Sequence, residues 1–173
     1  QIAEAWRQAK RPVILAGHGV LIAQAAEVLT ELAESMDTPV TTTLLGKGAF
    51  PETHRLSLGM LGMHGTAYAN KAMIECDFLL NIGSRFDDRI IGKASEFCKD
   101  AFIAHIDVDA AELGKMIKPN IAVRADAKDV VTALRNTAET TKHSAWNAHL
   151  NTYRKKYPLS YETHRGLTMQ QVI

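Results

Sequence analysis

Residues 58–89 form the stretch of sequence that most restricts how this chain can fold. A glycine-bearing turn at 61–65 precedes a predicted helix at 66–75, and the apolar run at 78–82 follows as a predicted buried strand. Glycine lets the backbone approach a ligand, and the first turn of a helix offers free N–H groups that favour an anion. The strand ends at Gly83, and residues 83–89 then place arginines and aspartates where open α/β sheets bind ligands. The stretch therefore predicts a site for a cofactor that carries phosphate.

The remaining segments repeat this order of strand, loop and helix. The run at 13–16 is continuously apolar, as expected of a parallel strand that is covered on both faces. Further strands are predicted at 39–43, 102–109 and 120–123, and amphipathic helices at 21–36, 130–138 and 146–157. A short helix with Trp6 on its apolar face opens the chain. The pattern predicts an α/β fold: a Rossmann-like (DHS-like) three-layer α/β/α domain with a parallel sheet of about six strands.

Two features at the carboxyl ends of predicted strands allow alternative interpretations. Gly17-His18-Gly19 resembles half of a dinucleotide fingerprint, although Ile22 stands in place of its third glycine. The alternative is a tight turn in which either glycine adopts a positive φ. Asp109 and Asp126 follow two other strands, where a carboxylate binds the hydroxyls of a ribose or ribityl chain or, alternatively, caps the next helix.

The overall charge and composition exclude several classes of partner. The 173 residues include 20 basic and 19 acidic side chains, for a formal net charge of +1, so bulk electrostatics favours neither nucleic acid nor a membrane surface. No apolar stretch approaches the roughly 20 residues that a transmembrane helix needs. Cys76 and Cys98 lack the spacing of a zinc site, which favours buried thiols in a reducing compartment over a disulfide.

Sequence motifs for catalysis or metal binding are missing. The histidines form no pair at i, i+3 or i, i+4 and no motif with a neighbouring acid, so no metal site is predicted. The nucleophile elbow of hydrolases and the phosphate-binding P-loop are missing too. Asp87 and Asp88 are either a general acid–base pair or ion-pair partners of Arg85 and Arg89, and ion pairing is the favoured interpretation.

Both ends of the sequence indicate a piece of a longer protein. The chain begins at Gln1 rather than at methionine, and Thr168 resembles the cap of a helix that has only begun. The strand and helix pattern of the sheet domain stops near residue 141. The predicted organisation is a central domain at 1–141, followed at 142–173 by a helix and a linker to a further domain.

Three motifs together resemble one enzyme family. LGMHGTAYAN at 61–70, GSRFDDR at 83–89 and HIDVD at 105–109 are similar to the central domain of acetolactate (acetohydroxyacid) synthase catalytic subunits, over about residues 1–138. The resemblance implies an enzyme that decarboxylates pyruvate and condenses it with a second 2-oxo acid in branched-chain amino-acid biosynthesis. It also implies FAD in a largely structural role on this domain, with thiamine diphosphate and Mg²⁺ held by flanking domains. The chain alone is therefore expected to be inactive.

The resemblance also implies roles for individual residues. At the mouth of the active site, at a subunit interface, it places Met63, His64, Asp88 and Arg89. A position in the core is the alternative for Met63. No catalytic residue is expected in this chain. The FAD contacts implied by position are Gly17, His18, Gly19, Thr43, Leu44, Leu61, Gly62, Met63, His64, Gly83, Ser84, Arg85, Phe86, Asp87, Arg89, Asp107, Val108, Asp126 and Ala127.

The same family likeness carries expectations about partners, and the sequence departs from the family at two positions. The likeness implies a homodimer or tetramer in the cytoplasm, a regulatory small subunit and 2-oxo acid substrates. His18 stands where the family has a glycine, so its side chain is expected to crowd the flavin, and Ala125 replaces the glycine before Asp126. Two other interpretations stay open: a scaffold domain without a nucleotide, and the central domain of a related thiamine-diphosphate enzyme such as a pyruvate oxidase or an oxo-acid decarboxylase.

Overall fold

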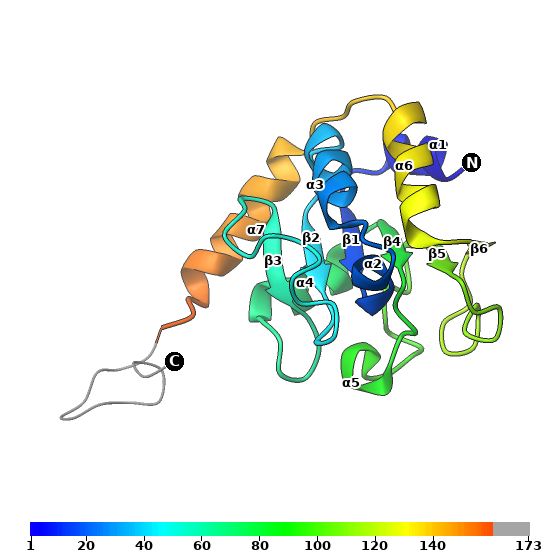
Figure 1. Ribbon diagram of the computed structural model, residues 1–173. Coiled ribbons are helices and arrows are strands. Elements are labelled where there is room, and N and C mark those ends of the chain that lie inside the picture. Colours follow the sequence, from blue (N-terminus) through cyan, green and yellow to red (C-terminus); the bar gives the residue numbers. More distant parts are fainter. Residues whose placement is uncertain (161–173) are drawn as a thin grey trace.

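A parallel sheet lies at the centre of the fold. The computed structural model describes residues 1–160, and in it six strands run in the order β3-β2-β1-β4-β5-β6 between two layers of helices (Figure 1). The order reverses between β1 and β4, as in doubly wound sheets that bind nucleotides. The predicted fold class is confirmed. The strands are β1 (Pro12–Ala16), β2 (Val40–Thr42), β3 (Ser57–Met60), β4 (Phe78–Ile82), β5 (Phe102–Asp107) and β6 (Ile121–Arg124).

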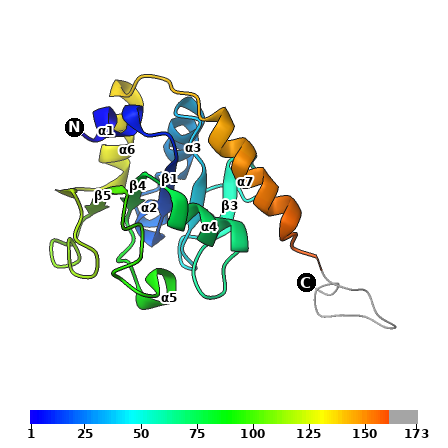
Figure 2. The same cartoon turned by 180° about the vertical axis from the view of Figure 1, so that it is seen from behind.

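The helices divide into two sets, because side chains on the two faces of the sheet enter separate hydrophobic clusters. One cluster joins the sheet to α1, α3 and α6, and the other joins it to α4 and α7. Figure 2, seen from behind, shows α4 beside α7. The helices are α1 (Ile2–Gln8), α2 (His18–Ile22), α3 (Ala26–Ser35), α4 (Ala67–Glu75), α5 (Asp88–Ile91), α6 (Ala127–Thr137) and α7 (Ser144–Lys156).

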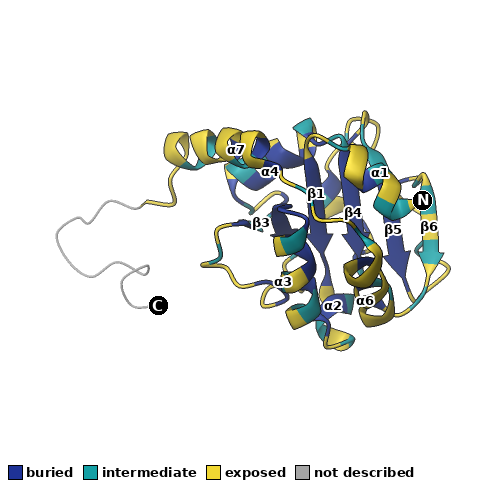
Figure 3. Cartoon of the chain, turned by 90° about the horizontal axis from the view of Figure 1, so that it is seen from above, coloured by how far each residue is buried: buried dark blue, intermediate teal, exposed yellow. Residues whose placement is uncertain are grey.

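The two central strands are buried along their whole length (Figure 3). In β1, Ile14 faces the first cluster and Leu15 the second, and β4 alternates in the same way through Leu80 and Leu79. A strand covered on both faces needs apolar side chains at every position, since either orientation removes them from water. The continuous apolar run at 13–16 is thereby explained, and its prediction as a buried strand is confirmed.

The structure corrects the sequence-based prediction of a single helix at 21–36. Two helices, α2 and α3, occupy this region, and Gln24 between them has a φ of 53°. The N–H of Ala25 donates to the carbonyl oxygen of Val20 at 2.9 Å, which closes the end of α2 around the left-handed residue. Strand β3 was not located by its sequence pattern, because it is a short strand that contains Gly59 at a φ of 68°.

Helix α7 packs against the sheet domain through its apolar face. Trp146 and Leu150 are buried in the second cluster, and the indole N–H of Trp146 donates to the carbonyl oxygen of Pro12 at 3.1 Å. The predicted amphipathic helix at 146–157 is confirmed, with a start at Ser144. The helix expected to begin at Thr168 and the last part of the predicted linker lie outside the described residues. Among the residues that the structure describes, no helix combines the length and apolarity needed to span a bilayer.

The two cysteines are buried, as expected. Cys76 ends α4 and Cys98 lies in the segment before β5, yet their Sγ atoms are 3.7 Å apart. Burial and the neighbouring Cys76 thiol raise the pKa of the Cys98 thiol, with the hydrogen bond to Cys76 as the largest cause. This proximity was not predictable from the spacing of the two residues in the sequence.

Candidate functional site

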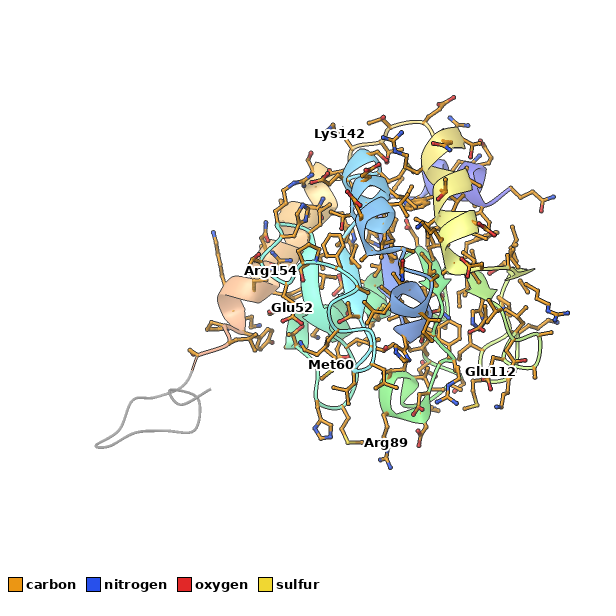
Figure 4. The ribbon with its side chains drawn as sticks, viewed as in Figure 1. Glu52, Met60, Arg89, Glu112, Lys142 and Arg154 are labelled. Carbon is orange, nitrogen blue, oxygen red and sulfur yellow. The ribbon has the colours of Figure 1, made fainter. Side chains whose placement is uncertain are left out.

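A cleft of about 660 Å³ opens at the carboxyl edge of the sheet, where the strand order reverses between β1 and β4. Its size is in the range of ligand-binding pockets, and its place is the one where doubly wound sheets bind ligands. Figure 4 shows two of its lining residues, Arg89 on α5 and Glu112 in the segment after β5, along this edge of the molecule. The cleft is the candidate functional site.

The floor of the cleft is formed by the loops after β1 and β4, which touch through their glycines. The N–H of Gly19 donates to the carbonyl oxygen of Gly83 at 3.1 Å. A Cβ atom on Gly17 would overlap that carbonyl oxygen, and one on Gly19 would lie 2.7 Å from the Gly83 Cα. Gly17 has a φ of −97°, and neither it nor Gly19 is among the positive-φ residues, so the tight-turn interpretation is wrong. These glycines are needed for close backbone contact.

Apolar side chains form the walls. Ile22, Leu44, Leu45 and Val108 line the cleft, and each is between 61% and 73% exposed. Apolar side chains gathered around a concave site usually bind an apolar group, because burying them against it removes their surface from water. The walls therefore favour a ligand that has an apolar part.

Carboxylates follow β5 and β6 into the lining. Asp107 is 9% exposed, and its Oδ1 accepts a hydrogen bond from the N–H of Asp109 at 2.9 Å. Asp126 caps α6 by accepting the N–H of Lys128 at 2.8 Å, so the capping interpretation of this residue is confirmed. Asp109 binds the N–H of Ala111 in a turn rather than in a helix. Each carboxylate uses one oxygen locally, which leaves the second able to accept a hydroxyl group.

The loop at 83–89 presents charge to the cleft on one side and an aromatic ring to the core on the other. Arg85 and Asp87 are 3.7 Å apart, and Arg89 and Asp88 are 4.0 Å apart, all on exposed side chains. The ion-pair interpretation of the two aspartates therefore agrees with the structure. Phe86 is buried, with its ring 4.9 Å from that of His105, and it contributes nothing to the lining of the cleft.

The turn at 61–65 lies beside the cleft. Thr66 caps α4, because its hydroxyl oxygen accepts the N–H of Ala69 at 3.1 Å. A side chain of the protein therefore binds one of the N–H groups at which the sequence predicted an anion. Asn70 holds both the N–H and the carbonyl oxygen of Gly62 at 2.9 Å. The N–H of Met63 donates to the carbonyl oxygen of Arg89, which ties the turn to α5. Met63 is 67% exposed, so its interpretation as a core residue is wrong.

The structure thus brings most of the predicted contact residues together, and separates a few. Those in the lining are His18, Gly19, Thr43, Leu44, Gly83, Ser84, Arg85, Asp87, Arg89, Asp107, Val108, Asp126 and Ala127. Those outside it are Gly17, Leu61, Gly62, Met63, His64 and Phe86. The two departures from the family, His18 and Ala125, both line the cleft.

Sequence reasoning missed part of the lining. Ile22, Leu45, Ile90, Ile106 and Glu112 also face the cleft. The pair Leu44-Leu45 gave a usable signal. Loops run over the protein surface, so two adjacent apolar side chains in a glycine-bearing loop indicate a surface that binds a ligand or partner. The others belong to helices, a strand or a loop without an unusual pattern. Within the described residues, no group of three or more His, Cys, Asp or Glu side chains is placed to hold a metal ion.

Comparison with known proteins relates this chain to one family of enzymes. Residues 1–134 match the family described as "Thiamine pyrophosphate enzyme, central domain". The chain is 46% identical over 171 residues to the acetolactate synthase large subunit of Parasynechococcus marenigrum, covering 96% of this chain and 28% of that protein. It is 44% identical over 160 residues to the acetolactate synthase large subunit of Cyanidium caldarium, covering 88% of this chain and 27% of that protein.

A third relative, the acetolactate synthase of Mycobacterium bovis, is 44% identical over 159 residues, which cover 88% of this chain and 26% of that protein. The chain therefore spans between 26% and 28% of the length of these three curated relatives. The family match extends from α1 into α6 and includes all six strands and the cleft between them. The chain belongs to the family of thiamine pyrophosphate enzyme central domains.

Proposed function

We propose that this chain is the central domain of an acetolactate synthase large subunit and that its cleft binds FAD. The observation that carries the proposal is the combination of apolar walls, strand-end carboxylates and an arginine in one cleft at the point where the strand order reverses. The names of the relatives support the choice of enzyme within the family.

The chemistry of the lining matches the parts of FAD. Asp107 and Asp126 offer carboxylate oxygens for hydroxyl groups of the ribose and ribityl chains. Arg85 offers a guanidinium for the diphosphate, and the walls at Leu44 and Val108 suit a ring system. In the proposed structural role the flavin supplies no chemical step. It stabilises the domain by binding only to the folded chain.

The whole enzyme is proposed by extension from the relatives. It decarboxylates pyruvate and condenses it with a second 2-oxo acid, with thiamine diphosphate and Mg²⁺ on domains outside this sequence. We place the boundary of the central domain at residue 141, with 142–173 leading onward. The enzyme is a cytoplasmic homodimer or tetramer with a regulatory small subunit. Met63, His64, Asp88 and Arg89, whose side chains are exposed, face the mouth of its active site.

A domain that only spaces its neighbours is the second candidate. It is favoured by the contact between Gly17, Gly19 and Gly83, which explains these glycines without any ligand. The cap that Asp126 makes on α6 likewise accounts for that residue without a ribose.

Titration of FAD into the purified chain separates the two candidates. Flavin fluorescence and calorimetry should show saturable binding, and Arg85→Ala should weaken it by about tenfold, because a charge-assisted hydrogen bond is lost. Asp107→Ala should weaken it as well. A folded wild-type chain that binds no FAD at millimolar concentration contradicts the flavin proposal and supports the spacing role.

A further inference from the structure

A pair of buried polar side chains lies directly behind the cleft. Asn81 of β4 and His105 of β5 are register partners on adjacent strands, and both are fully buried. Their neighbours on this face of the sheet, Leu15, Leu79 and Ile103, are apolar. Polar groups in such surroundings are costly unless they are hydrogen-bonded. The pair therefore calls for an explanation beyond packing.

Both side chains bind one backbone atom of the cleft loop. The amide Nδ2 of Asn81 donates to the carbonyl oxygen of Ser84 at 2.7 Å, and Nε2 of His105 lies 2.9 Å from the same oxygen. Because a carbonyl oxygen only accepts, Nε2 carries the hydrogen. Burial lowers the pKa of His105, which favours the neutral ring. Asn81 Oδ1 and His105 Nδ1 have no hydrogen-bond partner among the described residues. The pair thus gives the Ser84 carbonyl oxygen two donors, while one acceptor atom of each side chain is left without a donor.

Holding this carbonyl inward fixes the direction of the next N–H. All peptide bonds in the described chain are trans, and in a trans peptide the C=O and the following N–H point in opposite directions. The Ser84 carbonyl points toward the buried pair, so the N–H of Arg85 points away from the core. Ser84 and Arg85 both line the cleft. Neither backbone N–H donates a hydrogen bond within residues 1–160.

The surrounding backbone and charges suit an anion. Gly83 and Phe86, on either side of the two residues, have φ values of 60° and 54°. Consecutive N–H groups next to left-handed residues form concave sites for anions, and the guanidinium of Arg85 adds positive charge. The ion pair of Arg85 with Asp87 is long, at 3.7 Å, and solvent-exposed, so it leaves the guanidinium able to turn toward a ligand.

We propose that Asn81 and His105 are positioning residues: by holding the Ser84 carbonyl inward they aim the Arg85 N–H into the cleft, where it binds a phosphate group of the ligand. The inference rests on the proposed function for the identity of that ligand as a diphosphate-containing cofactor. The loop's affinity for the diphosphate group is measurable by itself.

The test uses inorganic diphosphate and FAD as separate probes. In ¹H–¹⁵N NMR spectra of the wild-type chain, diphosphate should shift the amide signal of Arg85 in a saturable way. His105→Leu should weaken both diphosphate and FAD binding by roughly tenfold, and Asn81→Leu, which leaves the His105 bond in place, by less. His105→Gln, whose amide again offers an N–H, should recover part of the affinity.

His143→Leu is the matched control. His143 is a second buried histidine whose ring nitrogens face backbone carbonyl oxygens, of Met36 and Ala9, away from the cleft. This variant should lose a comparable amount of thermal stability and keep both affinities within about twofold of the wild-type values. If His143→Leu and His105→Leu weakened ligand binding equally, the loss of affinity would follow from lower stability alone, and the positioning role would be overturned.

The remaining outcomes separate the inference from the proposed function. If the wild-type chain binds FAD and the variants at Asn81 and His105 bind it equally well, the positioning role is overturned and the flavin proposal stands. If diphosphate binds, FAD does not, and the variants weaken diphosphate, the positioning role stands and the flavin proposal is overturned. If neither probe binds the folded wild-type chain, both are overturned.

Discussion

At the scale of single residues, the contact between the loops after β1 and β4 depends on the absence of side chains. Gly83 combines two demands, since its φ is 60° and an added Cβ would lie 2.5 Å from the Gly19 Cα. The atoms that such a Cβ would meet belong to the backbone of Gly19, and they cannot relieve the clash by rotating as a flexible side chain does. Gly17 and Gly19 meet the steric demand alone, with ordinary backbone conformations.

Gly83→Ala is therefore expected to be strongly destabilising. Strain at a positive φ and the clash with Gly19 should together cost about 3 kcal/mol or more, measured by urea unfolding. Gly48→Ala is the matched control, because Gly48 has a φ of 94° and nothing within 4 Å of an added Cβ. It should cost only about 1 kcal/mol. Equal losses for the two variants would show that the contact between the loops contributes little.

At the scale of elements, α7 is joined to the sheet domain by polar contacts at its start. The carboxylate of Asp37, which follows α3, accepts the N–H of His143 at 2.8 Å and pairs with Arg55 at 2.8 Å. The backbone carbonyl oxygen of Asp37 accepts a hydrogen bond from the side-chain amide of Asn147 at 3.0 Å. Burial alone would raise the pKa of Asp37, but the hydrogen bonds from Arg55 and from the His143 N–H outweigh it and hold the pKa below its usual value.

The hydrogen bonds of the Asp37 carboxylate should make the free energy of unfolding depend on pH. A carboxyl group with a lowered pKa in the folded state stabilises fully above its unfolded pKa of about 3.9 and progressively less as the pH falls through the folded value. Asp37→Asn should cost about 1–3 kcal/mol at pH 7, and the gap to the wild-type protein should close below about pH 4. Urea unfolding from pH 7 to pH 2 measures both. Asp100→Asn, at an exposed position in the segment before β5, should show no such gap at any pH.

The elements also show which parts of the structure the sequence determines locally. Runs such as 13–16 and 78–82 were recognisable as central strands because burial on both faces requires apolar residues throughout. The break at Gln24 was hidden, since a left-handed glutamine leaves no glycine signal. In the site, Gly83 and Asp107 were predictable from their place after strands. The position of Gly62 was not, because it depends on Asn70 and Arg89, which belong to other elements.

At the scale of the whole molecule, the cleft is assembled from distant parts of the chain. Leu44, Arg85 and Asp126 follow three different strands and meet only in the folded sheet. A ligand that bridges them binds the folded state and has no comparable site on the unfolded chain. Its binding energy is then added to the free energy of unfolding.

FAD should therefore raise the melting temperature. At a free concentration 100 times its Kd, a ligand adds about 2.7 kcal/mol, which corresponds to roughly 5–10 °C for a chain of this size. Differential scanning calorimetry with and without FAD measures the shift. Arg85→Ala should show a smaller shift at the same FAD concentration, while its melting temperature without FAD stays close to that of the wild-type protein, because this side chain is 63% exposed. An unchanged wild-type melting temperature at saturating FAD would count against flavin binding.

The contact of Gly17 and Gly19 with Gly83 also bears on the order of folding. It joins the ends of two strands that are neighbours in the sheet but far apart in the sequence, with β2, β3 and α4 between them. Such a pairing has a high entropic cost of loop closure, so it forms late unless the intervening segment is already compact. The floor of the cleft therefore exists only once both halves of the sheet have come together. A ligand that contacts this floor therefore finds its complete site only after the two halves have joined.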